Sequence, residues 1–385
     1  MMRSSFLLLA PLAVLAACAG YTAPVSPSGD VKPLAAATAS QVESTLFLIG
    51  DAGSSAENEP VFAALIKQVD ATPGKRVIVF LGDNIYLRGM PDTGGIGRKE
   101  AERRIDAQLN VALRTRTETY FIPGNHDWDY MGPAGWDAVR REGAYIDEKG
   151  APFARMVPRG GCPGPEYVDP SPHLRVVMID TQWWLHDYDR PRDSTSTCPN
   201  YTAAGVVNAL NRQLLTAGDR NVVVAGHHPL ASGGMHGGYI GLSTHIFPLR
   251  ELRRWLYIPL PVIGSYYAFN REQGASDQDI AGPKNERMRR ALELVFSVRK
   301  PLVYVAGHDH GLQVIRGRTA QHLLISGSGE MNHQERVRYT PRTEYAASLP
   351  GFMRLDILKD RQVRLGVETV DANGVITETF AEYLK

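Results

Sequence analysis

The stretch VIVFLGDNIY, residues 77–86, joins an uninterrupted apolar run to a group of polar side chains. VIVF does not alternate between apolar and polar residues, which is typical of a strand buried on both faces of a sheet. Directly after it come Asp83, Asn84 and Tyr86, which carry a carboxylate, an amide and a phenol. Packing of the strand does not require these groups. The stretch therefore predicts a buried strand that delivers reactive side chains to one edge of a sheet.

Short, continuous apolar runs of this kind recur along the chain. Helix-like stretches with apolar residues at helical spacing separate some of them, at 105–113, 208–215 and 286–296. Strands that alternate with helices indicate an α/β layered domain. The segment 351–384 alternates more regularly and contains turn sequences, so we expect antiparallel strands that close the sheet. The predicted buried strands are residues 45–50, 77–82, 119–124, 174–180, 222–226, 302–306 and 323–327.

Five of these strands end in Asp, Asn or His. A structural turn explains any one of them, but five at one edge are difficult to explain by packing. In open α/β sheets, ligands bind beyond the carboxyl ends of the strands. Carboxylates, amides and imidazoles without thiolates suit iron, manganese or zinc. The residues that follow the five strands are Asp51; Asp83 and Asn84; Asn125, His126 and Asp127; His227 and His228; and His308, Asp309 and His310.

The order of the motifs GDxG, GDNxxY, GNHD, GHH and GHxH across residues 50–310 resembles that of the calcineurin-like metallophosphoesterases, and within them the purple acid phosphatases. The resemblance implies an α/β/β/α sandwich with two metal ions at the sheet edge. It also implies which residues hold these ions. The first metal would be bound by Asp51, Asp83, Tyr86 and His310, and the second by Asp83, Asn125, His227 and His308, with Asp83 bridging the two.

Tyr86 distinguishes branches of this superfamily. Many members have Asp-x-His at the first motif, where this chain has Asp51-Ala52-Gly53, and the resemblance lets Tyr86 replace the missing imidazole. A phenol has an ordinary pKa of about 10, so only a strongly charged cation would hold it as phenolate near neutrality. We therefore expect Fe(III) in the first site and divalent iron, zinc or manganese in the second. The alternative is that Tyr86 is a packing aromatic in a manganese or zinc enzyme.

Two further histidines, His126 and His236, match family positions that contact the phosphoryl oxygens or protonate the leaving alcohol. His236 could instead be an exposed loop histidine. Which of His227 and His228 is the ligand is less secure, although the spacing from the preceding valine favours His227. We interpret His245 and His322 as ordinary histidines without a role in the site.

The predicted centre indicates phosphoester hydrolysis by a metal-activated water, with His126 and His236 as general acids. We expect a phosphomonoesterase similar to acid phosphatases. The alternative on the same metals is a phosphodiesterase or nucleotide pyrophosphatase. An alternative of another class is a non-catalytic envelope lipoprotein that acts as a binding module, against which the intact ligand set argues.

The charge balance gives no sign of a nucleic-acid partner. The chain of 385 residues has 42 Lys and Arg against 41 Asp and Glu, a formal net charge of +1. No nucleic-acid binding surface is evident from such a balance. The sequence leaves the oligomeric state open.

The first residues, 1–18, combine Arg3, an apolar stretch and a small-residue exit, as in a secretory signal. Their end, LAAC, resembles a bacterial lipobox, so we expect a lipid anchor on Cys18; an ordinary cleaved signal is the alternative. Residues 19–44 are rich in Ala, Pro, Ser and Thr and predict a tether, which leaves 45–385 as one folded domain. We expect an exported, lipid-anchored protein of the bacterial cell envelope. The outer membrane is the preferred location, and the periplasm is the alternative.

The remaining cysteines, Cys162 and Cys198, form an even pair that predicts one disulfide in an oxidising compartment; two unpaired thiols are the alternative. Two inserts near 184–205 and 237–285 are longer than ordinary loops. The second contains the apolar stretch WLYIPLPVIGSYYAF, residues 255–269. We expect this stretch to pack onto the core, with a lid or a membrane-surface contact as alternatives.

Overall fold

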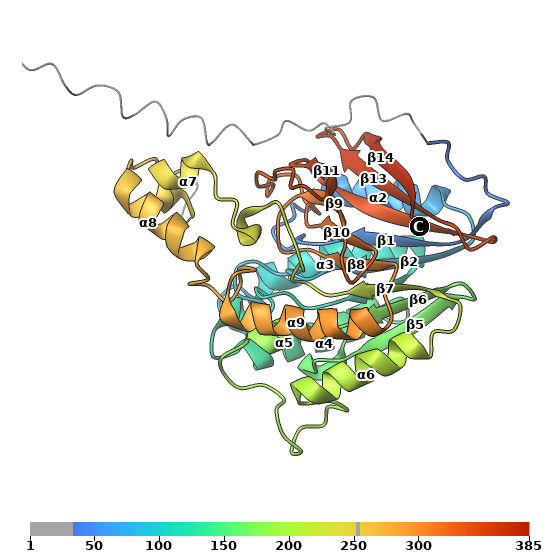
Figure 1. Ribbon diagram of the computed structural model, residues 1–385, viewed down its shortest axis with the longest axis horizontal. Helices are drawn as coiled ribbons and strands as arrows, with labels where there is room; N and C mark the ends of the chain where they lie inside the picture. Colours follow the sequence, from blue (N-terminus) through green and yellow to red (C-terminus); the bar gives the residue numbers. More distant parts are fainter. Residues whose placement is uncertain (1–33, 252–254, 385) are drawn as a thin grey trace, which may run out of the picture.

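Two sheets packed face to face form the centre of the computed structural model, which describes residues 34–251 and 255–384 (Figure 1). Within these residues each sheet has seven strands. The first sheet, in spatial order, contains β14 (Ile376–Leu384), β13 (Val363–Val370), β12 (Gly351–Leu358), β1 (Val42–Ile49), β2 (Lys75–Phe80), β3 (Glu118–Phe121) and β4 (Ala154–Met156). The second contains β11 (Thr343–Ala347), β9 (Leu312–Arg316), β10 (His322–Ser326), β8 (Val303–Ala306), β7 (Asn221–Ala225), β6 (Leu174–Met178) and β5 (Glu166–Ser171).

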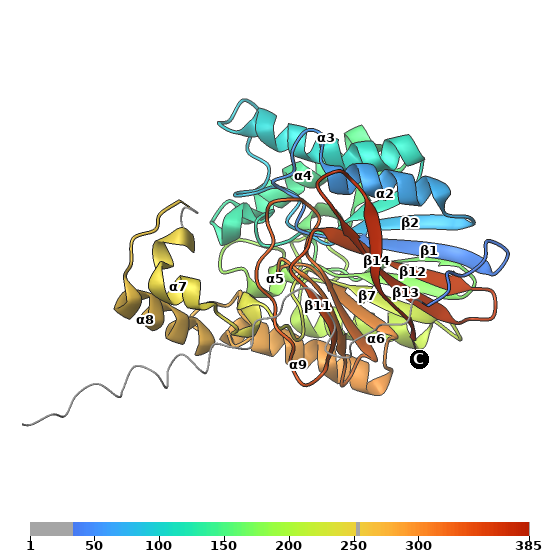
Figure 2. The same cartoon turned by 90° about the horizontal axis from the view of Figure 1, so that it is seen from above.

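Helices cover the outer face of each sheet, which gives an α/β/β/α sandwich. Figure 2 shows α2, α3 and α4 on the side of β1 and β2, and α6 and α9 on the opposite side. The first group is α2 (Pro60–Ala71), α3 (Arg98–Thr115) and α4 (Gly135–Gly150). The second group is α5 (Gln182–Leu185), α6 (Ala203–Leu215) and α9 (Pro283–Val298). The predicted fold class is confirmed.

Strands buried on both faces explain the continuous apolar runs. Successive side chains of a strand point to opposite faces. In β1, Leu46 and Leu48 pack into the core between the two sheets. Phe47 and Ile49 pack into a second core beneath α2 and α3. Because every face meets a packed layer, no position of the strand has to be polar.

Each predicted buried strand overlaps a β-strand of the structure at the same position in the chain. The helical segments expected at 105–113, 208–215 and 286–296 belong to α3, α6 and α9. The expected antiparallel closure is confirmed, because β12 pairs antiparallel with β1 and continues through β13 to β14. Helices α2 and α4 were not foreseen from the sequence.

The folded domain begins ahead of the expected Thr45. Strand β1 starts at Val42, and the guanidinium of the buried Arg364 donates hydrogen bonds to the carbonyls of Leu34 and Ala35. The expected signal, Cys18 and most of the tether lie in residues 1–33, outside the described part of the chain. In that described part, we find no helix both long and apolar enough to cross a membrane.

The second insert forms α7 (Leu242–Ile246), the 3-10 helix η5 (Pro248–Glu251) and α8 (Pro261–Glu272), which project beside the sandwich (Figure 1). Its apolar stretch, residues 255–269, does not pack onto the core as we expected. A Cβ on Gly264 would lie 2.2 Å from the carbonyl oxygen of His245, so α8 packs closely on α7 instead. Trp255, Val262 and Tyr266 are 73%, 82% and 70% exposed.

The predicted disulfide is present between Cys162 and Cys198, whose Cα atoms are 5.5 Å apart. It ties the loop before β5 to the first insert. A crosslink that closes a loop restricts the unfolded chain, and the sequence separation here is 36 residues.

We predict that the double variant Cys162→Ser/Cys198→Ser loses about 3–4 kcal/mol of unfolding free energy, because the unfolded chain regains loop entropy. Urea unfolding of the oxidised protein and the variant measures this difference. Reduction of the unchanged protein serves as a second route to the same state. Equal midpoints for all three samples would contradict the prediction.

Candidate metal centre

The seven predicted ligands converge where the carboxyl ends of strands from both sheets meet. Asp51 follows β1 and Asp83 follows β2, both in the first sheet. His227 follows β7 and His308 follows β8, in the second. The side chains of the whole set are buried, namely Asp51, Asp83, Tyr86, Asn125, His227, His308 and His310.

The backbone is unusual at three of these residues. Asp51, Asp83 and His308 have φ angles of 57°, 54° and 71°. The left-handed region costs energy for residues with a side chain, and such residues cluster at functional sites. A neighbouring glycine allows the close approach, because a Cβ on Gly124 would lie 2.3 Å from Oδ1 of Asp83. The GNHD motif thus requires glycine to admit the carboxylate.

A first group of donor atoms surrounds Tyr86. Its hydroxyl lies 3.2 Å from Oδ1 of Asp51 and 3.1 Å from Nε2 of His310. The third side of this triangle, between His310 Nε2 and Asp51 Oδ1, is 3.5 Å. A carboxylate, a phenol and an imidazole therefore face one point.

A second group lies around His227. Its Nε2 is 3.0 Å from Oδ1 of Asn125 and 3.2 Å from Nδ1 of His308. Oδ1 of Asp83 lies 3.4 Å from the same nitrogen. Ligand atoms of Asp51, Asp83 and His227 all lie within 4.8 Å of one another. Asp83 thus stands between the two groups, as a shared ligand would.

Hydrogen bonds to the outer ring nitrogen orient the imidazoles of His227 and His308. His227 Nδ1 lies 2.8 Å from the carbonyl oxygen of Leu81, and His308 Nε2 lies 2.9 Å from that of Gln278. A ring N–H that donates outward leaves the inner nitrogen with a free lone pair for a metal. Nδ1 of His310 lies 3.6 Å from Oε1 of Glu335, as an ion pair and not as a hydrogen bond.

His228 has both ring nitrogens engaged elsewhere. Nδ1 is 2.8 Å from the Thr181 hydroxyl, and Nε2 is 2.7 Å from Oε1 of Gln278. His227 is therefore the member of the pair that faces the centre.

The charges of the centre are arranged to receive cations. Burial opposes the charge of Asp83, but positive charge on His227 and His126 lowers the pKa of that carboxyl far below its ordinary range. Burial, followed by the carboxylates of Asp51 and Asp83, raises the pKa of the Tyr86 phenol well above its ordinary value. Only a strong positive charge at the centre would make Tyr86 a phenolate.

The two predicted acid residues lie beside this centre. Nδ1 of His126 is 2.8 Å from the carbonyl oxygen of Leu87, and its Nε2 is 3.9 Å from Oδ2 of Asp83. Nδ1 of His236 is 2.8 Å from Oδ1 of Asp279, and its ring centroid lies 3.8 Å from that of His308. Both histidines line a cavity of about 480 Å³ above the ligands. His236 is therefore part of the site.

The sequence model of the calcineurin-like phosphoesterase family matches residues 45–312. The chain belongs to the calcineurin-like phosphoesterase family. Members of this metallophosphoesterase family use a binuclear metal site, and the buried His and Asp groups fit such a site by their chemistry.

Particular relatives include purple acid phosphatases. The chain is 23% identical over 308 residues to tartrate-resistant acid phosphatase type 5 of Homo sapiens. The aligned region covers 74% of this chain and 73% of that protein. The purple acid phosphatase PPD1 of yellow lupin (Lupinus luteus) seeds is similar in fold, with a TM-score of 0.52 and 13% identity over 89% of this chain and 54% of that one. GAP50, the anchor in the inner membrane complex of Plasmodium, has a TM-score of 0.51 and 14% identity over 89% of both chains.

Asn84, in the stretch VIVFLGDNIY, stabilises this phosphoesterase site through hydrogen bonds to buried groups next to the ligands. Its Nδ2 donates to the carbonyl of Ile122 at 3.0 Å and to the carboxylates of Asp127 and Glu142 at 3.2 and 3.1 Å. Asp127 also accepts from the backbone N–H of Gly124 at 2.7 Å. These bonds join the turn after β2 to the turn after β3, which holds Asp83 near Asn125.

Residues that contact the site residues but were not found from the sequence include Gln278, Asp279, Glu335 and His333. Gln278 and Asp279 come from the end of the second insert, far from the motifs in the sequence. They follow no motif spacing, so only the folded chain reveals them. Arg271 of α8 donates through Nε to Oδ2 of Asp279 at 2.8 Å, which connects the insert to His236.

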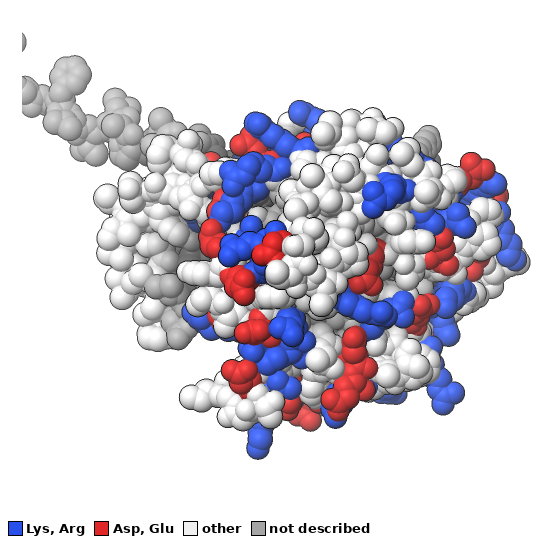
Figure 3. Space-filling model, turned by 90° about the horizontal axis from the view of Figure 1, so that it is seen from below, with Lys and Arg blue, Asp and Glu red and all other residues white. Residues whose placement is uncertain are grey.

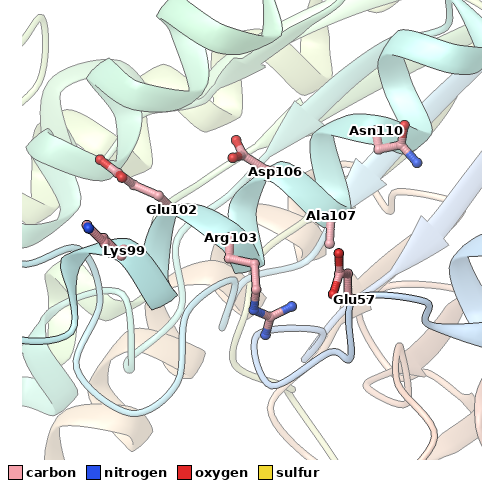
Figure 4. A pocket seen from close by; sticks show the side chains of 7 residues that line it. All are labelled: Glu57, Lys99, Glu102, Arg103, Asp106, Ala107 and Asn110. Carbon is pink, nitrogen blue, oxygen red and sulfur yellow. The ribbon is translucent and has the colours of Figure 1, made fainter.

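A second pocket, on the surface of α3, differs from the metal centre in its lining residues. Figure 4 shows its lining, which is mostly charged and contains no histidine. Arg103 there is paired with Glu100 on the same helix, at 2.7 Å. The lining residues are Glu57, Lys99, Glu102, Arg103, Asp106, Ala107 and Asn110. They do not converge as the buried ligands do.

We predict that metal affinity rises with pH, because cations compete with protons for two imidazoles. Burial alone would lower both pKa values, but Glu335 and Asp51 raise the pKa of His310 to about 10, and Asp83 raises that of His227 to about 9. Below these values each histidine holds a proton that a metal must displace, at a cost of roughly tenfold in affinity per pH unit for each proton.

Competition titration with a chelator of known proton affinity, at several pH values between neutral and 9, measures this dependence. Zinc is a suitable probe. An affinity that stays constant or falls as the pH rises would contradict the prediction.

Proposed function

We propose that this phosphoesterase hydrolyses phosphomonoesters with a metal-activated water, in the manner of an acid phosphatase. The observation that carries the proposal is the pair of donor groups that share Asp83. Two such groups would suit a pair of cations, the arrangement used in two-metal hydrolysis. When bound, the cations would lower the pKa of a coordinated water and stabilise charge on the phosphate oxygens.

The chain's own residues would hold and protonate the substrate. The backbone N–H of His126 donates to Oδ1 of Asp83 at 2.9 Å, which keeps the His126 ring at the rim of the centre. Asp279 holds Nδ1 of His236, so that Nε2 is the nitrogen left for substrate. Either ring would donate a proton to the leaving oxygen as a general acid.

We further propose Fe(III) in the Tyr86 group and divalent iron, zinc or manganese in the His227 group. The support is chemical: the buried phenol lies among carboxylates that oppose its ionisation. A trivalent ion is the partner best able to overcome that opposition. The alternative is that Tyr86 only packs against its neighbours and binds no ion, in which case the protein is a manganese or zinc enzyme.

We also propose that the protein is exported to the bacterial envelope and anchored by lipid on Cys18. Its support is the sequence of residues 1–18. Incorporation of labelled palmitate into the protein, and its loss in Cys18→Ser, tests the anchor independently of activity.

We predict that Asp83→Asn lowers kcat for p-nitrophenyl phosphate by at least about a thousandfold, because the shared carboxylate that positions both cations is lost. The matched control is Asp70→Asn, an exposed aspartate at the end of α2. Turnover and metal content of the purified, metal-loaded proteins are measured together. Full activity of Asp83→Asn would show that the assigned site is wrong.

A panel of other substrates separates the candidate functions. Phosphodiesters and nucleotide pyrophosphates turned over in preference to monoesters would favour the phosphodiesterase alternative. Stoichiometric metal without turnover of any phosphoester would favour the non-catalytic binding module.

We predict that Tyr86→Phe abolishes visible absorption of the iron-loaded protein, because a phenolate bound to Fe(III) absorbs visible light and a phenyl ring cannot bind the ion. Phe keeps the ring that packs 4.4 Å from His126 and 4.7 Å from His333, measured between centroids. Absorption spectra with metal analysis make the measurement, and Tyr188→Phe, an exposed tyrosine, is the control. A colourless, iron-free and active unchanged protein would rule out the Fe(III) assignment.

A further inference from the structure

The second insert exposes a concentrated apolar surface, which we call the α8 face. It extends from α7 through the segment before α8 to α8 itself, at the left of Figure 1. Among the described residues on the same side of the molecule, Figure 3 shows few in blue or red, whereas both charges are scattered over the sandwich. The exposed large apolar side chains of this face are Leu242, Trp255, Tyr257, Ile258, Val262, Ile263, Tyr266 and Phe269.

The outward direction of this face is built into the packing of α8. Gly264 and Ala268 are the buried residues of the helix, and Gly264 lies against the carbonyl of His245 in α7. Val262 and Phe269 occupy the opposite side and are 82% and 58% exposed. The pair α7 and α8 thus turns its small residues inward and its large ones to solvent. An apolar patch of this extent marks an interaction site.

We propose that the α8 face docks on the surface of a phospholipid bilayer that contains anionic lipid. Helix α8 has 12 residues, shorter than the roughly 20 that span a bilayer, so the contact is with one leaflet. Tryptophan and tyrosine together with branched aliphatic residues are typical of segments at the membrane interface.

Charge favours a membrane over a protein partner of mixed charge. The sequence between Glu251 and Glu272 contains no acidic residue. Arg250 lies at the edge of the face, with its guanidinium carbon 4.5 Å from the ring centroid of Tyr257. A cation beside an uncharged aromatic surface complements the phosphates of anionic lipids.

The proposed anchor at Cys18 would act together with this contact, and this step rests on that anchor. The anchor would raise the local concentration of the face at the membrane, and the face would set the orientation of the domain.

Docking would also place the active-site cavity near the lipid surface. Tyr267, Asn270 and Arg271 of α8 line the cavity, while Val262 and Tyr266 belong to the α8 face. One short helix thus contributes to both surfaces. Its cavity side reaches His236 through Arg271 and Asp279.

Quenching of Trp255 by brominated lipid tests the proposal in the full-length protein. The protein is added to vesicles of brominated phosphatidylcholine and phosphatidylglycerol, and the Trp255 signal is obtained by subtracting that of Trp255→Phe. We expect the Trp255 emission to shift to shorter wavelength and to be quenched on vesicles. The anchor alone does not produce this result, because it does not require Trp255 to touch lipid.

The variant Val262→Ser/Ile263→Ser should weaken docking by about tenfold or more, since two aliphatic side chains leave the contact, and should reduce the quenching accordingly. The matched control, Leu294→Ser/Val298→Ser, removes two exposed aliphatic side chains from α9. Melting curves and p-nitrophenyl phosphate turnover, where the protein has any, check that both variants are folded.

Three outcomes would overturn the proposal. The first is an unquenched Trp255 in protein bound to vesicles, which shows attachment by the anchor alone. The second is equal quenching in the α8 and α9 variants. The third is concentration-dependent dimerisation that buries Trp255 and is lost in Val262→Ser/Ile263→Ser, which shows that a second copy covers the face. Loss of phosphatase activity on every substrate refutes the proposed function but leaves this test unaffected.

Discussion

The position of Asp83 is the constraint on which the rest of the structure depends. Its carboxylate must reach both donor groups, so it lies against the backbone of Gly124 and beside Nε2 of His227. That requires the end of β2 to meet the ends of β3 and β7 at close range. Two sheets packed face to face with a common carboxyl edge satisfy this requirement, and the buried bonds of Asn84 to Asp127 hold the turns together.

The second insert serves the site and the surface at once. Its last residues supply the carbonyl of Gln278 to His308 and the carboxylate of Asp279 to His236. Its helices hold the α8 face away from the core. If the proposed docking occurs, the insert would connect the membrane contact to the position of His236 and His308, without any change in the predicted metal ligands.

Much of the fold and the candidate site could be predicted from the sequence, since the information is local. A continuous apolar run such as VIVF predicts a strand that is buried on both faces of its sheet. A polar residue directly after the run predicts where that strand ends. The fate of the stretch 255–269 could not be predicted in this way. Apolar composition states that a segment avoids water but not which surface covers it, so the expected packing onto the core was wrong.

The sequence by itself determined the α/β class, the layered strands and the order of carboxylate, amide and imidazole groups along the chain. Only the tertiary structure decided which nitrogen of each histidine faces the centre, because that choice depends on distant partners such as Leu81 and Gln278. It also decided that His227 and not His228 faces Asn125. The physical reason is that a side chain's orientation is set by hydrogen bonds between segments far apart in the chain, which no local pattern records.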